Sequence, residues 1–220
     1  MVDRGVNAQF EIAVIGAGNV GLALARTFLR ADAVTRVTLG VRRPEPLRAK
    51  FEPEGFSVET PAEAIVGADI VVLAVPGNVA VAVAVEHAAA LAGKVLIDCN
   101  NPVARAEGGL RWDPPAEGSL AQALAAAAPE AQVVKAFNGF GAEFHADPQL
   151  PEGPVDLLYA GDDADAKSRV HALAESAGFA PVDAGPLRNA SLLENMAILW
   201  IHLAMFGGQG RTFAFGLRRR

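Results

Sequence analysis

Short apolar runs alternate with amphipathic or alanine-rich runs along almost the entire chain. Runs rich in valine, isoleucine and leucine predict buried strands, at residues 11–15, 36–41, 69–76, 94–99, 132–137, 155–161 and 180–185. Apolar positions at helical spacing predict helices between them, at residues 19–31, 61–68, 77–93, 118–130, 163–178 and 187–206. This alternation is typical of a parallel sheet that is covered by helices.

The segment 77–93 fits a strand as well as a helix by its pattern, because valine and alanine alternate from Val79 to Val85. Its position favours a helix, since it lies between two predicted strands. Asn78 can cap such a helix, and Gly93 can end it.

The fold class that follows is α/β with a doubly wound parallel sheet. We expect a domain boundary near Gly153. Residues 1–153 then form the main domain. Residues 154–220 form a small C-terminal α/β cap that includes the long terminal helix.

Composition and charge exclude several classes of protein. The chain has 220 residues, 51% of them hydrophobic, which is enough to bury a sizeable core. A formal net charge of -6 argues against nucleic acid as a partner, since such partners need a broad basic surface. Residues 1–10 lack the apolar core of a signal peptide, and the most apolar late stretch, residues 195–206, is too short to cross a bilayer. With Cys99 as the single cysteine, these features predict a cytoplasmic protein with no membrane partner.

A glycine-rich turn joins the first predicted strand to the first predicted helix. Its sequence is G-x-G-x-x-G, formed by Gly16, Gly18 and Gly21 with Asn19 and Val20 between the last two. In this context the pattern is the fingerprint of a Rossmann-type dinucleotide-binding fold, in which the helix N-terminus holds the pyrophosphate. The alternative is a glycine turn that only serves packing.

The second predicted strand ends in arginines where many NAD-binding proteins have an acid. Arg42 and Arg43 stand at the place where a carboxylate would accept from the ribose 2′-hydroxyl of NAD. Guanidinium groups bind phosphate oxygens well, so we expect NADP(H) and not NAD(H), and residues 1–153 become an NADP-binding domain. The alternative is that both arginines are solvated loop charges.

Residues directly after the other strands form the rest of the predicted ligand edge. Ala74, Val75 and Pro76 are expected to flank the nicotinamide, and Asn101 to hydrogen-bond the cofactor. Asn138 follows a later strand and could bind a second substrate, although single asparagines are common in turns.

The other reactive side chains near this edge carry weaker signals. Cys99 is more typical of a small core residue than of a nucleophile. Lys135 could be a base, but a lysine at a strand end is more often a partly buried side chain that reaches solvent. No residue is assigned as catalytic.

The four histidines give no metal signal, because they are far apart and no carboxylate or cysteine cluster accompanies them. His202 shares a predicted helix face with Asn195 and Ile198, and this face could line a second-substrate pocket. A satisfied core histidine, or one at a dimer seam, is an equal alternative.

The chain resembles the family of coenzyme F420-dependent NADP oxidoreductases in the stretches IAVIGAGNVG, GVRRPE, DCNNPV, VVKAFN, DAGPLRNASLLE and GGQGRTFAFGL. The resemblance implies hydride transfer between NADPH and a deazaflavin (coenzyme F420) or a flavin such as FMN or FAD. In that family the two rings carry the chemistry and the protein orients them. By position in the family fold, the residues implied to touch the acceptor are Asn138, Asn195, Ile198, His202 and Thr212.

The chain departs from the family at one of these positions. The deazaflavin enzymes tend to carry a histidine where this chain has Asn138, whereas VVKAFN is more similar to the cytosolic reductase domain of the STEAP metalloreductases, which use a flavin. The identity of the acceptor therefore stays open at this point.

Two other functions fit the same pattern. One is an imine reductase of the pyrroline-5-carboxylate type, although residues 155–185 read as strand, helix, strand and not as an all-helical domain. The other is a redox sensor that binds NADPH without turnover. The terminal helix has more apolar surface than a small cap can cover, so we also expect a homodimer.

Overall fold

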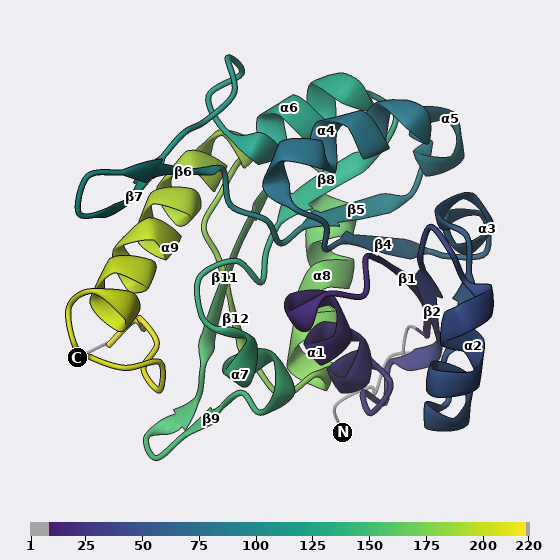
Figure 1. The fold of residues 1–220 in the computed structure, drawn as a ribbon, viewed down its shortest axis with the longest axis horizontal. Helices are drawn as coiled ribbons and strands as arrows, with labels where there is room; N and C mark the ends of the chain where they lie inside the picture. The colour runs from purple at the N-terminus through teal and green to yellow at the C-terminus, as the bar shows by residue number, and fades with distance from the viewer. Residues whose placement is uncertain (1–8, 219–220) are drawn as a thin grey trace, which may run out of the picture.

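The computed structural model describes residues 9–218 as one central sheet with helices on both faces (Figure 1). We expect no signal peptide in residues 1–10, and residues 1–8 of this segment lie outside the described residues. From one edge to the other, the sheet consists of β12 (Ala180–Asp183), β11 (Asp156–Gly161), β8 (Gln132–Lys135), β5 (Val95–Asp98), β4 (Ile70–Leu73), β1 (Phe10–Ile15), β2 (Val34–Gly40) and β3 (Ser57–Glu59).

The strand order confirms the predicted α/β fold with a Rossmann-like, mostly parallel sheet. β8, β5, β4, β1, β2 and β3 run parallel to one another. β11 runs antiparallel to β8, with Ala160 opposite Lys135 and Gly161 opposite Val134. β12 is again parallel to β11.

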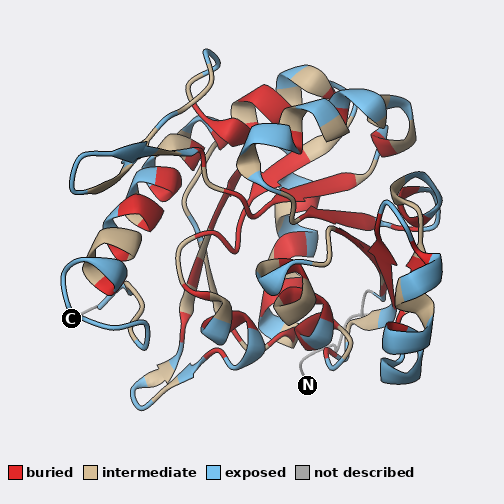
Figure 2. Ribbon diagram, in the orientation of Figure 1, coloured by how far each residue is buried: buried red, intermediate tan, exposed pale blue. Residues whose placement is uncertain are grey.

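Successive side chains along each strand point to opposite faces of the sheet. Both faces therefore carry apolar side chains, and helices cover both of them. On one face, Ile12 and Val14 of β1 pack in a core with α1 (Asn19–Phe28), α8 (Ala164–Ser176) and Phe144 of α7 (Ala142–Ala146). On the other face, Ala13 and Ile15 pack with α3 (Pro61–Val66), α4 (Gly77–Glu86), α5 (Ala88–Leu91) and α6 (Leu120–Ala127). Figure 2 shows the buried strands between these layers.

The remaining elements lie at the ends of the sheet and beside the terminal helix. α2 (Glu45–Phe51) and the 3-10 turn η1 (Glu52–Glu54) precede β3. The hairpin of β6 (Val103–Ala106) and β7 (Gly109–Trp112) lies along α9 (Ala190–Met205), which follows the 3-10 turn η2 (Leu187–Asn189) (Figure 1). β9 (Gln149–Leu150) and β10 (Gly153–Pro154) form a second small hairpin.

The predicted helix over 77–93 forms, but it is divided at His87 into α4 and α5. The expectation that Asn78 caps it is wrong, because the N-cap residue is Pro76 and no side chain caps the helix. Gly93 does adopt the left-handed backbone, at φ 72°, just beyond its end.

Residues 154–220, expected as a cap, contribute β11, β12 and α9. Because β11 pairs with β8, these residues extend the same sheet as the main domain. The boundary near Gly153 itself stays a prediction. Over the described range, no helix combines the length and the apolar character that a membrane span requires.

His145 on α7 is buried among aromatic rings, 1% exposed, and its Nδ1 has no hydrogen-bond partner among residues 9–218. Its ring lies 5.1 Å from that of Phe140 and 6.4 Å from that of Phe137, centroid to centroid. Burial lowers the pKa of His145 from 6.5 to about 3, against a small opposing effect of Glu143.

Acid should therefore destabilise the protein through His145. Below pH 6.5 His145 binds a proton in the unfolded chain but stays neutral in the folded chain. The free energy of unfolding should therefore fall by about 2 kcal/mol between pH 7 and pH 5 from this group alone. Urea unfolding at several pH values measures the slope. His145→Leu should flatten it, whereas His171→Gln, at a half-exposed site, should leave it unchanged; equal slopes in wild type and His145→Leu would refute the assignment.

Candidate active site

The glycine turn between β1 and α1 has the backbone that a dinucleotide site needs. Gly16 adopts φ 107°, and a Cβ there would collide with the carbonyl oxygen of Ala74. A Cβ at Gly21 would collide with the carbonyl oxygen of Gly16, so only glycine fits at both positions. At Gly18, by contrast, an added Cβ would meet no atom within 4 Å, so this side of the turn is open to a ligand.

The N-terminus of α1 points its free amide groups at this open side. Gly18 is the N-cap residue and no side chain caps the helix. The first turn carries no acidic residue, so nothing neutralises the positive end of the helix dipole. The turn therefore fits the pyrophosphate of a dinucleotide, as the sequence predicts.

Gly18→Ala should separate folding from cofactor binding. Its φ of -79° suits alanine, and the added methyl group meets no protein atom, so thermal stability should be unchanged. The same methyl group would occupy the approach of the pyrophosphate, so affinity for NADPH should fall by about tenfold or more. Thermal melting and fluorescence titration with NADPH measure the two effects, and an unchanged affinity would contradict this role for Gly18.

Arg42 and Arg43 follow β2 at the same edge of the sheet and are both exposed. Neither makes a hydrogen bond or ion pair with any residue in the range 9–218. The nearby Arg48, in contrast, is engaged with Glu59 at 3.1 Å and with the carbonyl oxygen of Val58. The two guanidinium groups are thus free to bind a phosphate, and their assignment to the 2′-phosphate of NADP stays a prediction.

The residues that follow β4, β5 and β8, which are expected to flank the nicotinamide, lie next to one another. Val75 approaches Gly16, and a Cβ on Gly77 would lie 2.9 Å from the carbonyl oxygen of Asn101. Asn101 and Asn138 then exchange hydrogen bonds: the Asn101 amide donates to the carbonyl oxygen of Asn138 at 3.0 Å, and the Asn138 amide donates to Asn101 Oδ1 at 2.8 Å. The structure therefore brings together the residues that were predicted from separate strand ends. Their binding roles are untested.

Asn138 is held by an unusual backbone at the preceding residue. Phe137 has φ 60°, a left-handed conformation that costs a residue with a side chain about 1–2 kcal/mol. Its buried ring packs edge-on against Phe28 and Phe179, each 5.6 Å away, and this packing offsets the strain. Such strain is typical of functional sites. Asn138 also donates to the carbonyl oxygen of Leu193 at 3.1 Å, which joins β8 to α9.

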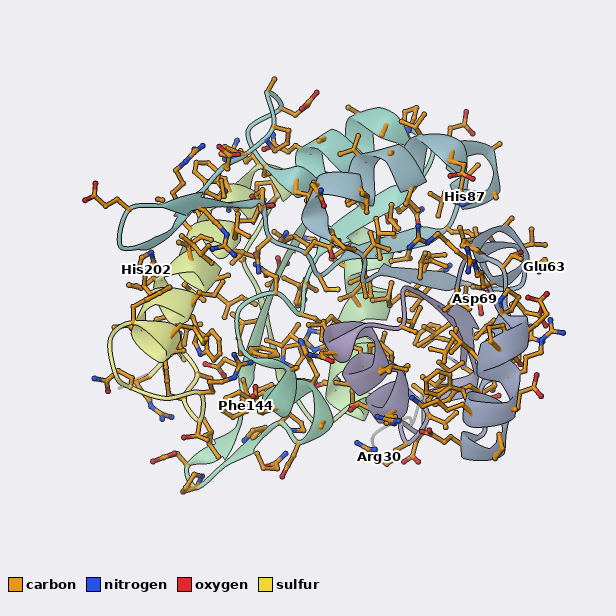
Figure 3. All side chains as sticks on the ribbon, in the orientation of Figure 1. Arg30, Glu63, Asp69, His87, Phe144 and His202 are labelled. Carbon is orange, nitrogen blue, oxygen red and sulfur yellow. The ribbon has the colours of Figure 1, made fainter. Side chains whose placement is uncertain are left out.

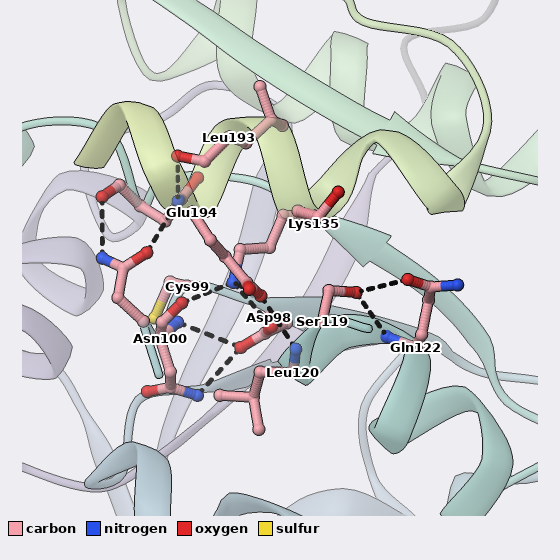
Figure 4. Close-up of polar contacts among 12 residues, drawn as sticks. Asp98, Cys99, Asn100, Ser119, Leu120, Gln122, Lys135, Leu193 and Glu194 are labelled. Atoms are coloured by element: carbon pink, nitrogen blue, oxygen red, sulfur yellow. Dashed lines mark hydrogen bonds and ion pairs between the residues drawn. The ribbon is translucent and has the colours of Figure 1, made fainter. Parts of the chain in front are cut away.

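Lys135 corrects the sequence-based interpretation of a partly buried lysine that reaches solvent. Its side chain is fully buried and Nζ donates to Asp98 at 2.8 Å, to Glu194 at 3.0 Å and to the carbonyl oxygen of Asn100 (Figure 4). Burial opposes the charge, but the attraction and hydrogen bonds of both carboxylates outweigh it, so the pKa of Lys135 is raised. Lys135 is therefore a charged structural link and is not poised as a general base.

Glu194, on α9, connects this buried group to two further elements. Its Oε1 accepts from the backbone amide of Leu120 at 3.0 Å, at the start of α6, and its Oε2 accepts from Trp112 Nε1 at 3.0 Å. Glu194 is not among the residues predicted from the sequence, although an acid on an otherwise apolar helix is a signal that a buried partner exists. Its partners come from distant segments, so their identity could not be read from spacing.

The residues implied to touch an acceptor do not line one common cavity in the described structure. Asn138 lines a cavity of about 10 Å³, while Asn195 and Thr212 are exposed and Ile198 is buried. The ring of His202, labelled in Figure 3, contacts the carbonyl oxygen of Leu110 through Nε2 at 2.6 Å. His202 thus has the satisfied partner that the alternative interpretation expected, and its role in binding is untested.

The cavity beside Asn138 is small because the segment after α9 folds back over it. Phe215 from this segment and Met196 from α9 both line it. Three contacts hold the segment: Arg211 with Glu143 at 2.6 and 3.0 Å, Trp200 Nε1 with the carbonyl oxygen of Phe213 at 2.8 Å, and the Leu217 amide with Asp156 at 2.5 Å. A space of this size holds about one water molecule and no aromatic ring.

Other chemistry at this edge finds no support in the described residues. Cys99 is buried as expected, and burial together with the charge of Asp98 raises its pKa to about 12, so it is not a nucleophile. Among residues 9–218, no group of three or more histidine, cysteine, aspartate or glutamate side chains is arranged to hold a metal ion.

Comparison with known proteins identifies the family. A family model described as NADP oxidoreductase coenzyme F420-dependent matches residues 11–102. The F420-dependent NADP reductase of Methanothermobacter thermautotrophicus is 33% identical over 208 residues, which cover 88% of this chain and 88% of that protein. The chain belongs to this family of NADP-dependent oxidoreductases.

Two further proteins resemble this chain. A crystal structure from Arthrobacter sp. FB24, provisionally assigned as an F420-dependent NADP-reductase, aligns with a TM-score of 0.84 at 30% identity, over 96% of this chain and 100% of that chain. Metalloreductase STEAP3 of Rattus norvegicus is 30% identical over 192 residues, 84% of this chain. This chain spans 36% of STEAP3, so the likeness concerns part of that protein.

Proposed function

We propose that this chain binds NADPH along the carboxyl edge of its sheet and transfers a hydride between NADPH and coenzyme F420. The observation that carries the proposal is the continuous edge from the open Gly18 turn to the Asn101–Asn138 pair, with two unengaged arginines beside it. The names of the reductases in this family support F420 as the acceptor, and a flavin is the alternative that must be tested beside it.

In this proposal, the side chains bind and orient the cofactor, and none of them has to act as a nucleophile. Gly18 and the α1 N-terminus hold the pyrophosphate, and Arg42 with Arg43 holds the 2′-phosphate. Val75, Pro76 and Asn101 position the nicotinamide beside Asn138. NADPH supplies the hydride, and the acceptor ring takes it up.

The acceptor must reach the nicotinamide past the segment that covers Asn138. Phe215 lines the cavity of about 10 Å³ beside Asn138, so an acceptor ring that binds there requires this side chain to move. A filled pocket also fits the second candidate function, a sensor that binds NADPH without turnover.

Stopped-flow oxidation of NADPH with F420, FMN or FAD distinguishes these functions. We expect rapid, saturable oxidation with F420 and slower oxidation with the flavins. Rapid oxidation of NADPH by a flavin, with none by F420, would show that the acceptor is a flavin and not F420. Tight NADPH binding with no oxidation by any acceptor would favour the sensor, and no binding of NADPH would refute the proposal.

We further propose that the protein forms a homodimer through α9. Four apolar side chains on α9 and just beyond it are more than half exposed: Leu192, Leu199, Met205 and Phe206. Such a patch is typical of a protein interface. Light scattering at micromolar concentration should give the mass of a dimer, and a monomer would argue against it.

A further inference from the structure

The buried group of Asp98, Lys135 and Glu194 has one cation and two carboxylates. All three side chains are 0% exposed. Charges this deeply buried are usually balanced, because an excess charge is costly away from water. The excess charge is therefore a feature to explain beyond the hydrogen bonds that Glu194 accepts from Leu120 and Trp112.

Hydrogen bonding indicates that both carboxylates are ionised. Asp98 Oδ1 accepts from the backbone amide and from Nδ2 of Asn100, both at 3.0 Å, while Oδ2 accepts from Lys135. The Glu194 oxygens also accept only from N–H donors among the residues that the structure describes. Acceptance from N–H donors alone is the pattern of ionised carboxylates, which have no proton to donate. With Lys135 charged, the group carries a formal charge of minus one.

This charge lies directly behind the proposed nicotinamide edge. Lys135 donates to the carbonyl oxygen of Asn100, and the next residue is Asn101, which pairs with Asn138. The positive end of α6 offsets part of the charge of Glu194, because Leu120 is the first residue of that helix. Beyond Lys135, the hydrogen bonds to Asp98 come from neutral donors only.

We propose that Glu194 sets the redox state of the nicotinamide that this site prefers, by supplying the excess negative charge behind Asn101. The inference rests on the proposed function. In the reaction, a hydride leaves C4 of the reduced nicotinamide with its electron pair and bonds to the acceptor. The acceptor is thereby reduced and takes a proton from water, and a positive charge remains on the nicotinamide. A buried negative charge favours this cation over the neutral reduced ring. The site thereby favours oxidation of NADPH over reduction of NADP⁺.

Dissociation constants for NADP⁺ and NADPH, measured by calorimetry on the full chain, test this inference. Glu194→Gln alone would set an amide N–H against the indole N–H of Trp112, so we combine it with Trp112→Phe and compare it with Trp112→Phe alone. Removing the charge should weaken NADP⁺ relative to NADPH by about fivefold, because one negative charge near the cationic ring is lost and the protein screens it only in part. Glu117→Gln removes the same charge at an exposed site and should leave the ratio unchanged.

A ratio that is unchanged in the double variant, while the variant unfolds cooperatively, would overturn the inference. If the double variant does not fold, Asp98→Asn takes its place with the same expected change. Because the double variant is compared with Trp112→Phe alone, an unchanged ratio overturns the inference while leaving the proposed function intact, provided that both variants bind NADPH. Binding of neither form would refute both.

Discussion

Lys135→Met should destabilise the protein by about 3–5 kcal/mol, the largest effect that we expect from any single substitution. The methionine can occupy a similar volume, but it removes the ammonium group that lies 2.8 Å from Asp98 and 3.0 Å from Glu194, and so leaves both carboxylates buried without a cation. Urea unfolding followed by circular dichroism measures the loss.

A second lysine provides a matched control for this prediction. Lys167 pairs with Asp183 at 2.9 Å, but its side chain is 21% exposed and that of Asp183 46%. Lys167→Met should therefore cost less than about 1 kcal/mol. If Lys135→Met costs no more than this control, the buried group contributes far less to stability than its geometry indicates.

Replacing Arg42 and Arg43 together with alanine should weaken NADPH binding by about 100-fold and change NADH binding by less than about threefold. Charge-assisted hydrogen bonds to a phosphate contribute about 1.5–3 kcal/mol each, and NADH has no 2′-phosphate to receive them. Both side chains are exposed and unengaged within the described chain, so the substitution should leave the fold intact. Fluorescence titration with both cofactors gives the two ratios.

The control for the arginine pair is Arg169→Ala, which removes an exposed arginine from α8. It should alter neither affinity. A loss of the same size for NADPH and NADH in the Arg42→Ala variant would exclude a role in phosphate binding and would turn the choice of cofactor back into an open question.

The sequence was sufficient to predict the parallel strands and the edge at which they end, because both depend on local patterns. β1, the glycine turn and α1 follow one another within residues 10–28, and each imposes a recognisable constraint on the chain. The positions after β4, β5 and β8 could be placed at one edge because parallel strands end on the same side.

Local patterns could not predict contacts between distant segments. Glu194 meets Lys135 across 59 residues and Trp112 across 82, and no spacing rule links such positions. The hairpin of β6 and β7 was missed because its exposed strands lack the apolar runs of the central sheet. The position of Phe215 beside Asn138 could not be predicted either, because Phe215 belongs to a segment without regular structure.

The reversed direction of β11 has a consequence for how this protein could diverge. β11 meets β8 only at Ala160 and Gly161, so its first residues, from Asp156, project beyond the end of β8 and form a side wall next to Asn138. Substitutions in that wall can reshape the space beside Asn138 without disturbing β1 and the glycine turn, which lie several strands away. The part of the sheet proposed to bind the dinucleotide and the part next to Asn138 can therefore change independently.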